Sequence, residues 1–132
     1  MANQELVIKT NKEKEIIDIT DEIKSLIHKK KIENGVCHLF ITHTTAALTT
    51  ADLDPGTDLD FLDFLEKIKP SINYRHPHNP EHAPDHILSS IIGASLTIPV
   101  QDGRLVLGTW QRIVLVELDG PRLRNLSISF LT

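Results

Sequence analysis

The segment Ser95–Phe130, SLTIPVQDGRLVLGTWQRIVLVELDGPRLRNLSISF, decides the fold class, because most of it has the pattern of β-strands. Asp102-Gly103 lies between two β-prone runs, and an Asp-Gly pair in that position is a strong hairpin signal. Further on, one apolar run is typical of a buried strand, and the last run alternates apolar and polar residues. We therefore expect antiparallel strands at Ser95–Val100, Leu105–Leu107, Ile113–Leu118 and Leu126–Phe130.

The first half of the chain adds further strands. Glu5–Thr10 and Glu15–Thr20 are short β-prone runs separated by Asn11–Lys14, a pattern that predicts a hairpin. Val36–Thr42 is largely apolar, and Ala47–Ala51 is expected to form another strand.

Apolar residues recur at helical spacing in three other segments. Lys29–Lys31 lie near the end of the first, where cations suit the helix dipole, so we interpret them as a solvated helix end. Strands that bracket two or three helices predict an α+β fold, an antiparallel β-sandwich with flanking helices, in a single domain spanning residues 1–132. The helix boundaries are expected at Thr20 or Asp21 and Gly35, at Thr57 as N-cap and Pro70, and at Pro84 and Gly93.

Composition excludes several classes of protein. The net charge of −4 and the pI near 5.9 argue against general nucleic-acid binding, which needs a basic face. No apolar run reaches the ~20 residues that span a bilayer. The first ten residues lack the pattern of a signal peptide, and the single Cys37 fits a reducing compartment. These features predict a soluble cytoplasmic protein without nucleic-acid or membrane partners.

The stretch Tyr74–His86, YRHPHNPEHAPDH, contains four of the seven histidines of the chain. Three prolines within it prevent a continuous helix. A long irregular loop in a small domain is usually functional or disordered. Neutral imidazole is the commonest protein metal ligand, so the stretch is a candidate site.

A catalytic zinc site uses three protein ligands and leaves one position open. His43, His86 and one of His76, His78 or His82 could supply the ligands. The acidic residues Asp52, Asp54, Asp58 and Asp85 could orient the imidazoles. The alternative is that the histidines are exposed loop residues with no shared partner.

Other polar and aromatic residues allow two interpretations each. Trp110 could line a pocket or fill the core. Arg122 and Arg124 could bind phosphate or form surface ion pairs. Glu117 lies in an apolar run, so it should face solvent, meet a cation or belong to a site. Cys37 is more often a small buried hydrophobe than a ligand, and the pattern leaves the roles of Cys37, His38 and His78 open.

Four motifs together resemble the YjbQ family, also called the secondary thiamine-phosphate synthase family. They are HTTA at His43–Ala46, IPV at Ile98–Val100, LGTWQ at Leu107–Gln111 and DGPR at Asp119–Arg122, within a match that covers nearly all of the chain after Gly35. One branch of the family differs from this chain, which has His76-Pro77-His78 where that branch has His-Asp.

The resemblance implies a β-sandwich with helices packed alongside, assembled as a homotrimer. It implies a metal-binding or active site near a subunit boundary, to which His43, His86 and then His76 carry over by position. It also implies a secondary activity in thiamine-phosphate synthesis, which joins a pyrimidine diphosphate to a thiazole phosphate and releases pyrophosphate.

We therefore hypothesise a metal-dependent enzyme that acts on a small phosphorylated molecule, with zinc as the expected ion and magnesium as the alternative. A second hypothesis is a non-catalytic trimeric module that binds a metal or an anion, and a third is a structural trimer tied by histidines. The candidate residues are His43, His86, Asp85 and Asp58 for catalysis, Thr44, Trp110, Gln111 and Arg122 for substrate, and His43, His76, His82 and His86 for the metal.

Overall fold

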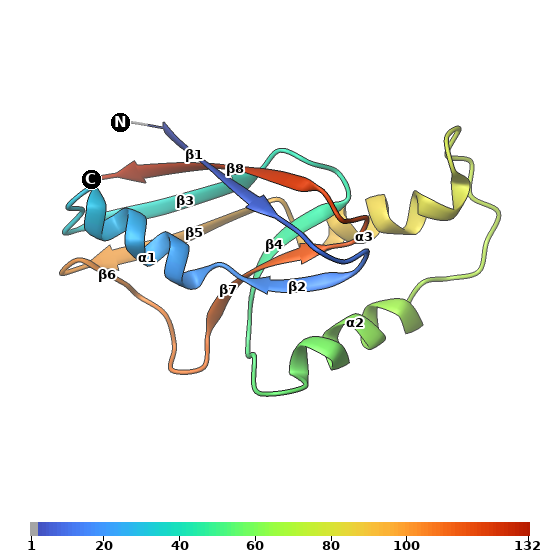
Figure 1. Ribbon diagram of the computed structural model, residues 1–132, viewed down its shortest axis with the longest axis horizontal. Coiled ribbons are helices and arrows are strands. Elements are labelled where there is room, and N and C mark those ends of the chain that lie inside the picture. Colours follow the sequence, from blue (N-terminus) through green and yellow to red (C-terminus); the bar gives the residue numbers. More distant parts are fainter. Residues whose placement is uncertain (1–2) are drawn as a thin grey trace.

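A computed structural model describes residues 3–132. Its larger sheet has five strands in the order β1-β8-β3-β5-β6, and every neighbouring pair is antiparallel. The first and last strands of the chain pair with each other, and the start of β1 lies beside the end of β8 (Figure 1). The strands are β1 (Asn3–Lys9), β8 (Leu123–Leu131), β3 (Gly35–Ile41), β5 (Ser95–Gln101) and β6 (Arg104–Leu105).

A smaller antiparallel sheet has three strands in the order β2-β7-β4. Its central strand is the apolar run that the sequence singled out as a buried strand, and five of its six residues are buried. The expected α+β fold with antiparallel sheets is thus confirmed. The strands are β2 (Glu15–Asp18), β7 (Arg112–Glu117) and β4 (Ala46–Ala51).

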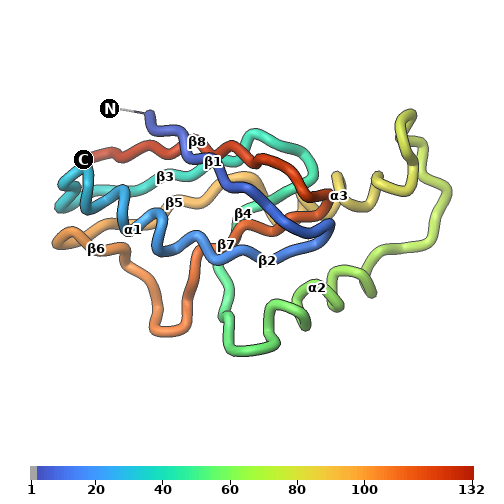
Figure 2. Tube along the Cα trace, viewed as in Figure 1, coloured from blue at the N-terminus to red at the C-terminus, as the bar shows by residue number. Residues whose placement is uncertain are grey.

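Three α-helices cover the sheets. The first inserts Ile23 and Ile27 into the apolar layer between the sheets. The other two pack against the smaller sheet, and a long connection joins them at one end of the molecule (Figure 2). The helices are α1 (Thr20–Lys29), α2 (Thr57–Lys67) and α3 (Ala83–Ile92), and a short 3-10 helix, Pro80–His82, precedes α3.

The two faces of β7 belong to two different cores. Ile113 and Leu115 pack into the layer between the sheets, while Val114 and Val116 pack toward α2 and α3. Successive side chains of a strand point to opposite faces, so a strand buried on both faces is apolar throughout. Glu117 follows the odd-numbered positions and therefore enters the layer between the sheets, where a carboxylate needs a partner.

Two local predictions were wrong. Glu15–Asp18 does not form a hairpin with the first strand, because β1 pairs with β8 while β2 pairs with β7 in the other sheet. Neither Thr20 nor Asp21 caps α1, because Asp18 accepts hydrogen bonds from the backbone N–H and hydroxyl of Thr20 at 3.0 and 2.6 Å. The periodicity located the segments, but register and capping depend on tertiary contacts.

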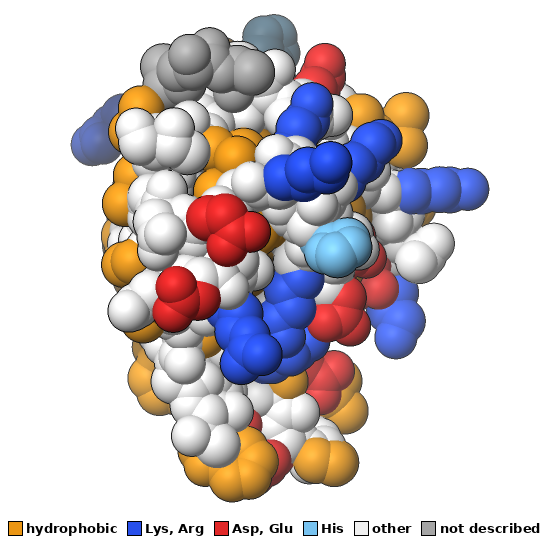
Figure 3. Space-filling view, turned by 90° about the vertical axis from the view of Figure 1, so that its left-hand side faces the viewer, with side chains coloured by type: hydrophobic (Ala, Val, Ile, Leu, Met, Phe, Trp, Pro, Cys, Tyr) orange, Lys and Arg blue, Asp and Glu red, His pale blue; other side chains and the backbone are white. Residues whose placement is uncertain are grey.

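The prediction of Thr57 as the N-cap of α2 was also wrong. Gly56, with φ of 91°, occupies the N-cap position, and Thr57 is the first helical residue. Lys29–Lys31 at the end of α1 are exposed, as expected for a solvated helix end. On the face of the molecule seen from that side, Lys and Arg side chains lie among Asp and Glu side chains (Figure 3). Within residues 3–132, no helix is long and apolar enough to cross a bilayer.

Candidate functional site

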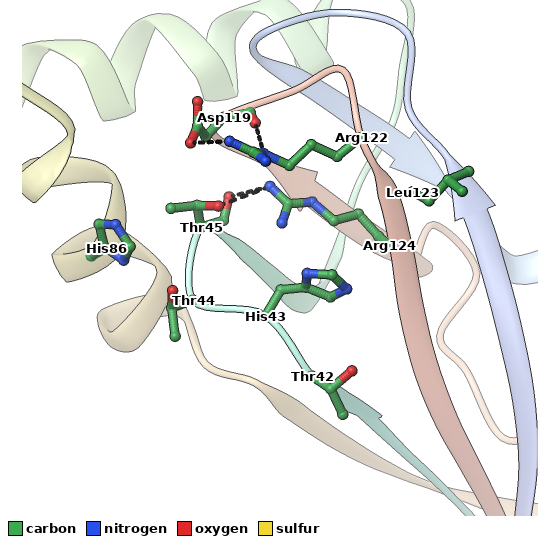
Figure 4. Close-up of a pocket in the computed structure, with 9 residues that line it drawn as sticks. All are labelled: Thr42, His43, Thr44, Thr45, His86, Asp119, Arg122, Leu123 and Arg124. Atoms are coloured by element: carbon green, nitrogen blue, oxygen red, sulfur yellow. Dashed lines mark hydrogen bonds and ion pairs between the residues drawn. The ribbon is translucent and has the colours of Figure 1, made fainter. Parts of the chain in front are cut away.

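A pocket of about 720 Å³ lies where the β3–β4 connection, the start of α3 and the β7–β8 turn meet. Two histidines and two arginines line it together with threonine hydroxyls (Figure 4). His43 and His86 therefore do converge on one polar pocket, although they are 43 positions apart in the chain. The lining residues are Thr42, His43, Thr44, Thr45, His86, Asp119, Arg122, Leu123 and Arg124.

A buried ion pair lies beside this pocket. Arg124 is 2% exposed and Glu117 is 0% exposed. Arg124 Nε donates to Glu117 Oε1 at 2.9 Å, and its Nη2 donates to Oε2 of the same carboxylate. Thr10 Oγ1 donates to Glu117 Oε1 at 2.7 Å. Burial alone would raise the pKa of Glu117, but the hydrogen bonds from Arg124 and Thr10 lower it below its ordinary value.

The same guanidinium holds the β3–β4 connection in place. Arg124 Nη2 donates to the Thr45 carbonyl oxygen at 3.1 Å and to Thr45 Oγ1 at 2.9 Å. The Thr45 carbonyl also accepts from the backbone N–H of Leu118 at 3.1 Å. Because two strands clamp Thr45, the residues next to it have a fixed backbone from which to present side chains.

His43 is fixed from the opposite side by β8. The backbone N–H of Asn125 donates to His43 Nε2 at 2.9 Å. Burial lowers the pKa of His43 below its ordinary value, and the nearby Arg124 and Arg122 lower it further against the opposing effect of Glu117. His43 is thus held as a neutral imidazole at neutral pH.

The β7–β8 turn carries the second arginine of the pocket. Arg122 Nε donates to the Asp119 carbonyl oxygen at 2.7 Å, and its Nη2 donates to Asp119 Oδ2 at 3.1 Å. Gly120 must lack a side chain, because a Cβ there would lie 2.4 Å from the Lys12 carbonyl oxygen and 2.8 Å from Glu117 Cγ. The backbone of the turn at Gly120 therefore packs directly against the side chain of Glu117 in the buried ion pair. The side chain of Arg122 remains 54% exposed, so it can turn toward a ligand.

Asp85 forms a second charged cluster at the start of α3. It is 3% exposed and pairs with Lys14 Nζ at 2.7 Å and Lys69 Nζ at 3.4 Å. His82 Nδ1 lies 3.2 Å from Asp85 Oδ2 and 3.7 Å from Asp119 Oδ1. Burial alone would raise the pKa of Asp85, but Lys14, His82 and Lys69 lower it below its ordinary value. Asp85 is therefore a buried and fully paired carboxylate, and His82 connects its cluster to Asp119 at the pocket.

His76 and His86 stack on each other, with ring centroids 4.8 Å apart and planes at 23°. His76 Nδ1 is also hydrogen-bonded to the carbonyl oxygen of His78, and the His78 side chain is exposed. The histidine stretch thus brings His86 to the pocket wall and His76 against it, and leaves His78 in solvent.

Three predicted site residues lie elsewhere. Trp110 is 69% exposed and lines a separate groove with Arg112, so its interpretation as a core residue is wrong. Gln111 Nε2 donates to Thr50 Oγ1 at 3.0 Å in that region. Asp58 is half-buried in the first turn of α2 and does not line the pocket.

Cys37 is 0% exposed in the main core, and burial raises its pKa to about 12. Such a thiol stays protonated at neutral pH, as a small buried hydrophobe should.

The predicted metal ligands do not gather in one chain. Within residues 3–132, no three His, Cys, Asp or Glu side chains lie close enough together to hold an ion. His43 Nε2 accepts from Asn125, and His82 Nδ1 is directed at Asp85. The described residues of a single chain thus do not fit a three-ligand zinc site, and the divalent ion stays a prediction.

The model of the UPF0047 protein YjbQ-like family matches residues 4–132. The chain belongs to this family. The resemblance drawn from the HTTA, IPV, LGTWQ and DGPR motifs is thereby confirmed.

Relatives in this family span archaea and bacteria. The UPF0047 protein MJ1081 of Methanocaldococcus jannaschii is 39% identical, over 94% of this chain and 90% of the relative. The UPF0047 protein YugU of Bacillus subtilis is 37% identical, over 96% of each.

Solved structures of similar proteins have the same fold. A YbjQ-like protein of unknown function from Sulfolobus solfataricus superposes with a TM-score of 0.90 at 34% identity, over 98% of this chain and 95% of the other. A hypothetical protein from Aeropyrum pernix gives a TM-score of 0.89 at 33% identity, over 99% and 98%.

In this YjbQ-like chain, four residues selected from the sequence line the pocket, namely His43, Thr44, His86 and Arg122. Arg124 was considered for phosphate binding but was not selected, and neither were Thr45 and Asp119. A signal for Arg124 was available. It shares the alternation of Leu126 and Ile128, which puts it on the buried face of the last strand. A buried Glu117 needs a cation, and Arg124 is an arginine on the buried face of a neighbouring strand in the sequence.

Proposed function

We propose that this protein is an enzyme that acts on a small phosphorylated molecule bound in the pocket between the Thr42–Thr45 segment and the start of β8. The observation that carries the proposal is the convergence of Arg122, Arg124, His43 and His86 on one pocket of about 720 Å³. Guanidinium groups bind phosphate oxygens with parallel N–H donors, and imidazole and hydroxyl groups supply further donors.

Each arginine of the pocket is paired with a carboxylate, and the two pairs differ in exposure. Glu117 offsets the charge of Arg124 inside the protein, while the more exposed Arg122 pairs with Asp119 at the surface. An exposed ion pair contributes little to stability, so a phosphate can replace Asp119 as the partner of Arg122 at little cost in free energy. The exposed side chain of Thr44 lies on the same wall and provides a hydroxyl donor.

The reaction we propose is the thiamine-type transfer. The thiazole ring nitrogen would form a bond to the methylene carbon of the pyrimidine diphosphate. The bond from that carbon to the diphosphate oxygen would break, and pyrophosphate would leave with its electron pair. Donors that meet the departing oxygen more strongly as its charge grows accelerate such a step. Arg122 and His86 are the side chains we assign to this task, because both line the pocket without being fixed by β8.

Two further parts of the proposal involve partners. The divalent ion would draw some of its ligands from the phosphate oxygens of the substrate or from a neighbouring subunit. The assembly would be a homotrimer. Size-exclusion chromatography with light scattering measures that assembly, and a mass of about one chain, 14.8 kDa, would contradict it.

The direct test uses purified protein analysed for bound metal and then assayed with the pyrimidine diphosphate and the thiazole phosphate. We expect thiamine phosphate and pyrophosphate to form in equal amounts. The control is the double variant His43→Ala/His86→Ala. Product no greater than that of the control would contradict this reaction.

The alternative is a non-catalytic module that binds a metal or an anion. It is favoured by the pairing of each cationic or acidic group at the pocket, since Arg122 pairs with Asp119 and Arg124 with Glu117. Tight binding of inorganic pyrophosphate without turnover of either precursor would support it. A structural trimer tied by histidines predicts instead that a chelator separates the subunits.

A further inference from the structure

The guanidinium of Arg124 has one nitrogen that is not used by the protein. Nε and Nη2 make all of its hydrogen bonds among residues 3–132, to Glu117 and Thr45. In the same part of the chain, no buried side-chain nitrogen or oxygen lacks a partner. Nη1 must therefore reach the accessible space of the pocket that Arg124 lines. A charged side chain that is 2% exposed thus presents one donor group to this space.

The hydrogen bond from Asn125 fixes the tautomer of His43. A backbone N–H only donates, so His43 Nε2, at 2.9 Å from it, must accept. The proton of the ring is then on Nδ1. One ring nitrogen of His43 faces β8, and the other lies on the side of the Arg124 guanidinium (Figure 4). Nδ1–H of His43 and Nη1 of Arg124 are therefore two donors directed toward one region of the pocket.

Among residues 3–132, neither His43 Nδ1–H nor Arg124 Nη1 has a protein acceptor. Neighbouring donors without a shared acceptor are unfavourable, and an anionic oxygen between them would satisfy both. Neither group can turn away cheaply. Glu117 and Thr45 hold the guanidinium, and Asn125 holds the imidazole.

We propose that His43 Nδ1–H and Arg124 Nη1 form a rigid two-donor anchor for one phosphate oxygen of the bound molecule. This inference rests on the proposed function and assigns its first contact. It makes His43 a hydrogen-bond donor rather than a metal ligand through Nε2. It also gives the two arginines different roles. Arg124 anchors the phosphate, while the exposed Arg122 closes over it.

The first measurement is the tautomer of His43 in the intact protein. Long-range ¹H–¹⁵N spectra of histidine-labelled protein at neutral pH should show His43 protonated at Nδ1 and unprotonated at Nε2. A proton on Nε2 would overturn the anchor. This readout needs no ligand and no catalytic activity.

The second measurement is the affinity for inorganic pyrophosphate, determined by calorimetry with a matched pair of variants. His43→Asn places an amide donor near the position of Nδ1, and His43→Gln places an amide near Nε2, where it can accept from Asn125. We expect His43→Gln to weaken binding by about tenfold or more, and His43→Asn to weaken it by about threefold or less. Equal loss in both variants, or no loss in His43→Gln, would overturn the anchor.

Substitution of Arg124 risks unfolding, so its part is tested in the wild-type chain. Added pyrophosphate should shift and slow the exchange of the Arg124 Nη protons, and should shift His43 Nδ1. Binding that leaves both resonances unmoved would overturn the anchor and leave the proposed function standing. A wild-type chain that binds neither pyrophosphate nor inorganic phosphate would overturn both.

Discussion

The Thr42–Thr45 segment and the Tyr74–His86 stretch both bring histidines to the same end of the molecule, but the protein holds them differently. Arg124 and Leu118 clamp Thr45, and Asn125 binds His43. In the other stretch, residues 68–79 form no helix or strand, and His78 is exposed. The segment with one histidine thus supplies the fixed wall of the pocket, and the segment with four supplies its more open side.

Candidate ligands are better ranked by how firmly the protein holds them than by how many lie close together in the sequence. A high local count of histidines records only what is available, whereas a functional geometry needs groups whose positions are fixed by buried partners. Glu117 and Arg124 provide those partners for His43 and Thr45. Substitutions that remove these partners one at a time show how much each of them holds the pocket in place.

The largest effect is expected from Glu117→Gln. Removing one member of a buried ion pair leaves Arg124 uncompensated, which typically costs about 3–5 kcal/mol of unfolding free energy. The matched control is Asp119→Asn, whose partner Arg122 is mostly exposed, and here we expect a loss below about 1 kcal/mol. Urea unfolding measures both. Equal losses would mean that the buried pair does not support the pocket.

A smaller loss is expected from Asp85→Asn, of about 1–3 kcal/mol, because Lys14 and Lys69 can turn back to water. The pKa values of Asp85 and Glu117 are both lowered on folding, so each carboxylate stabilises the protein above its unfolded pKa. That stability is lost as the pH falls through the folded pKa.

The free energy of unfolding should therefore decrease as the pH falls below the ordinary pKa values of the two groups, 3.8 for Asp85 and 4.5 for Glu117. The Asp85→Asn variant should lose less of its stability over the same pH range than the wild-type chain. A variant with an unchanged slope would show that Asp85 contributes nothing to it.

An even smaller effect on stability is expected from the titration of His43. Burial and the two arginines lower its pKa below the ordinary 6.5, so its folded imidazole should remain neutral at pH 6.5. Because the unfolded chain binds this proton first, His43 makes the protein less stable as the pH falls below 6.5. Carbon-13 chemical shifts of its ring report the midpoint. A midpoint at or above 6.5 would contradict the arrangement.

The smallest effects are expected from His78→Ala and Trp110→Ala. Both side chains are exposed and neither lines the pocket. Unfolding free energies should remain within about 0.5 kcal/mol of the wild type. Pyrophosphate affinity should remain within about twofold. A tenfold loss of affinity in either variant would place the binding site outside the pocket.

The strands and helices were predictable because their periodicity is local. The expected strand Ile113–Leu118 overlaps β7, which ends one residue earlier, and Leu126–Phe130 lies within β8. The pairing of β1 with β8 was not predictable, since it joins the two ends of the chain and no turn signal marks it.

The pocket was predictable only in part. His43 and His86 were placed correctly from their positions at the end of a strand and the start of a helix. Their buried supports were missed, because the partnership of Glu117 and Arg124 depends on two strands facing each other across the core. The stack of His76 on His86 likewise depends on how the long connection folds back.

The central claim is that the fixed wall of the pocket, rather than the histidine stretch, receives the phosphate. Backbone ¹H–¹⁵N spectra of the labelled chain, titrated with inorganic pyrophosphate, test it residue by residue. We expect the largest shifts at the amides of Thr44, Thr45, Arg124 and Asn125. Shifts confined to residues 74–82, with those four amides unmoved, would contradict the claim.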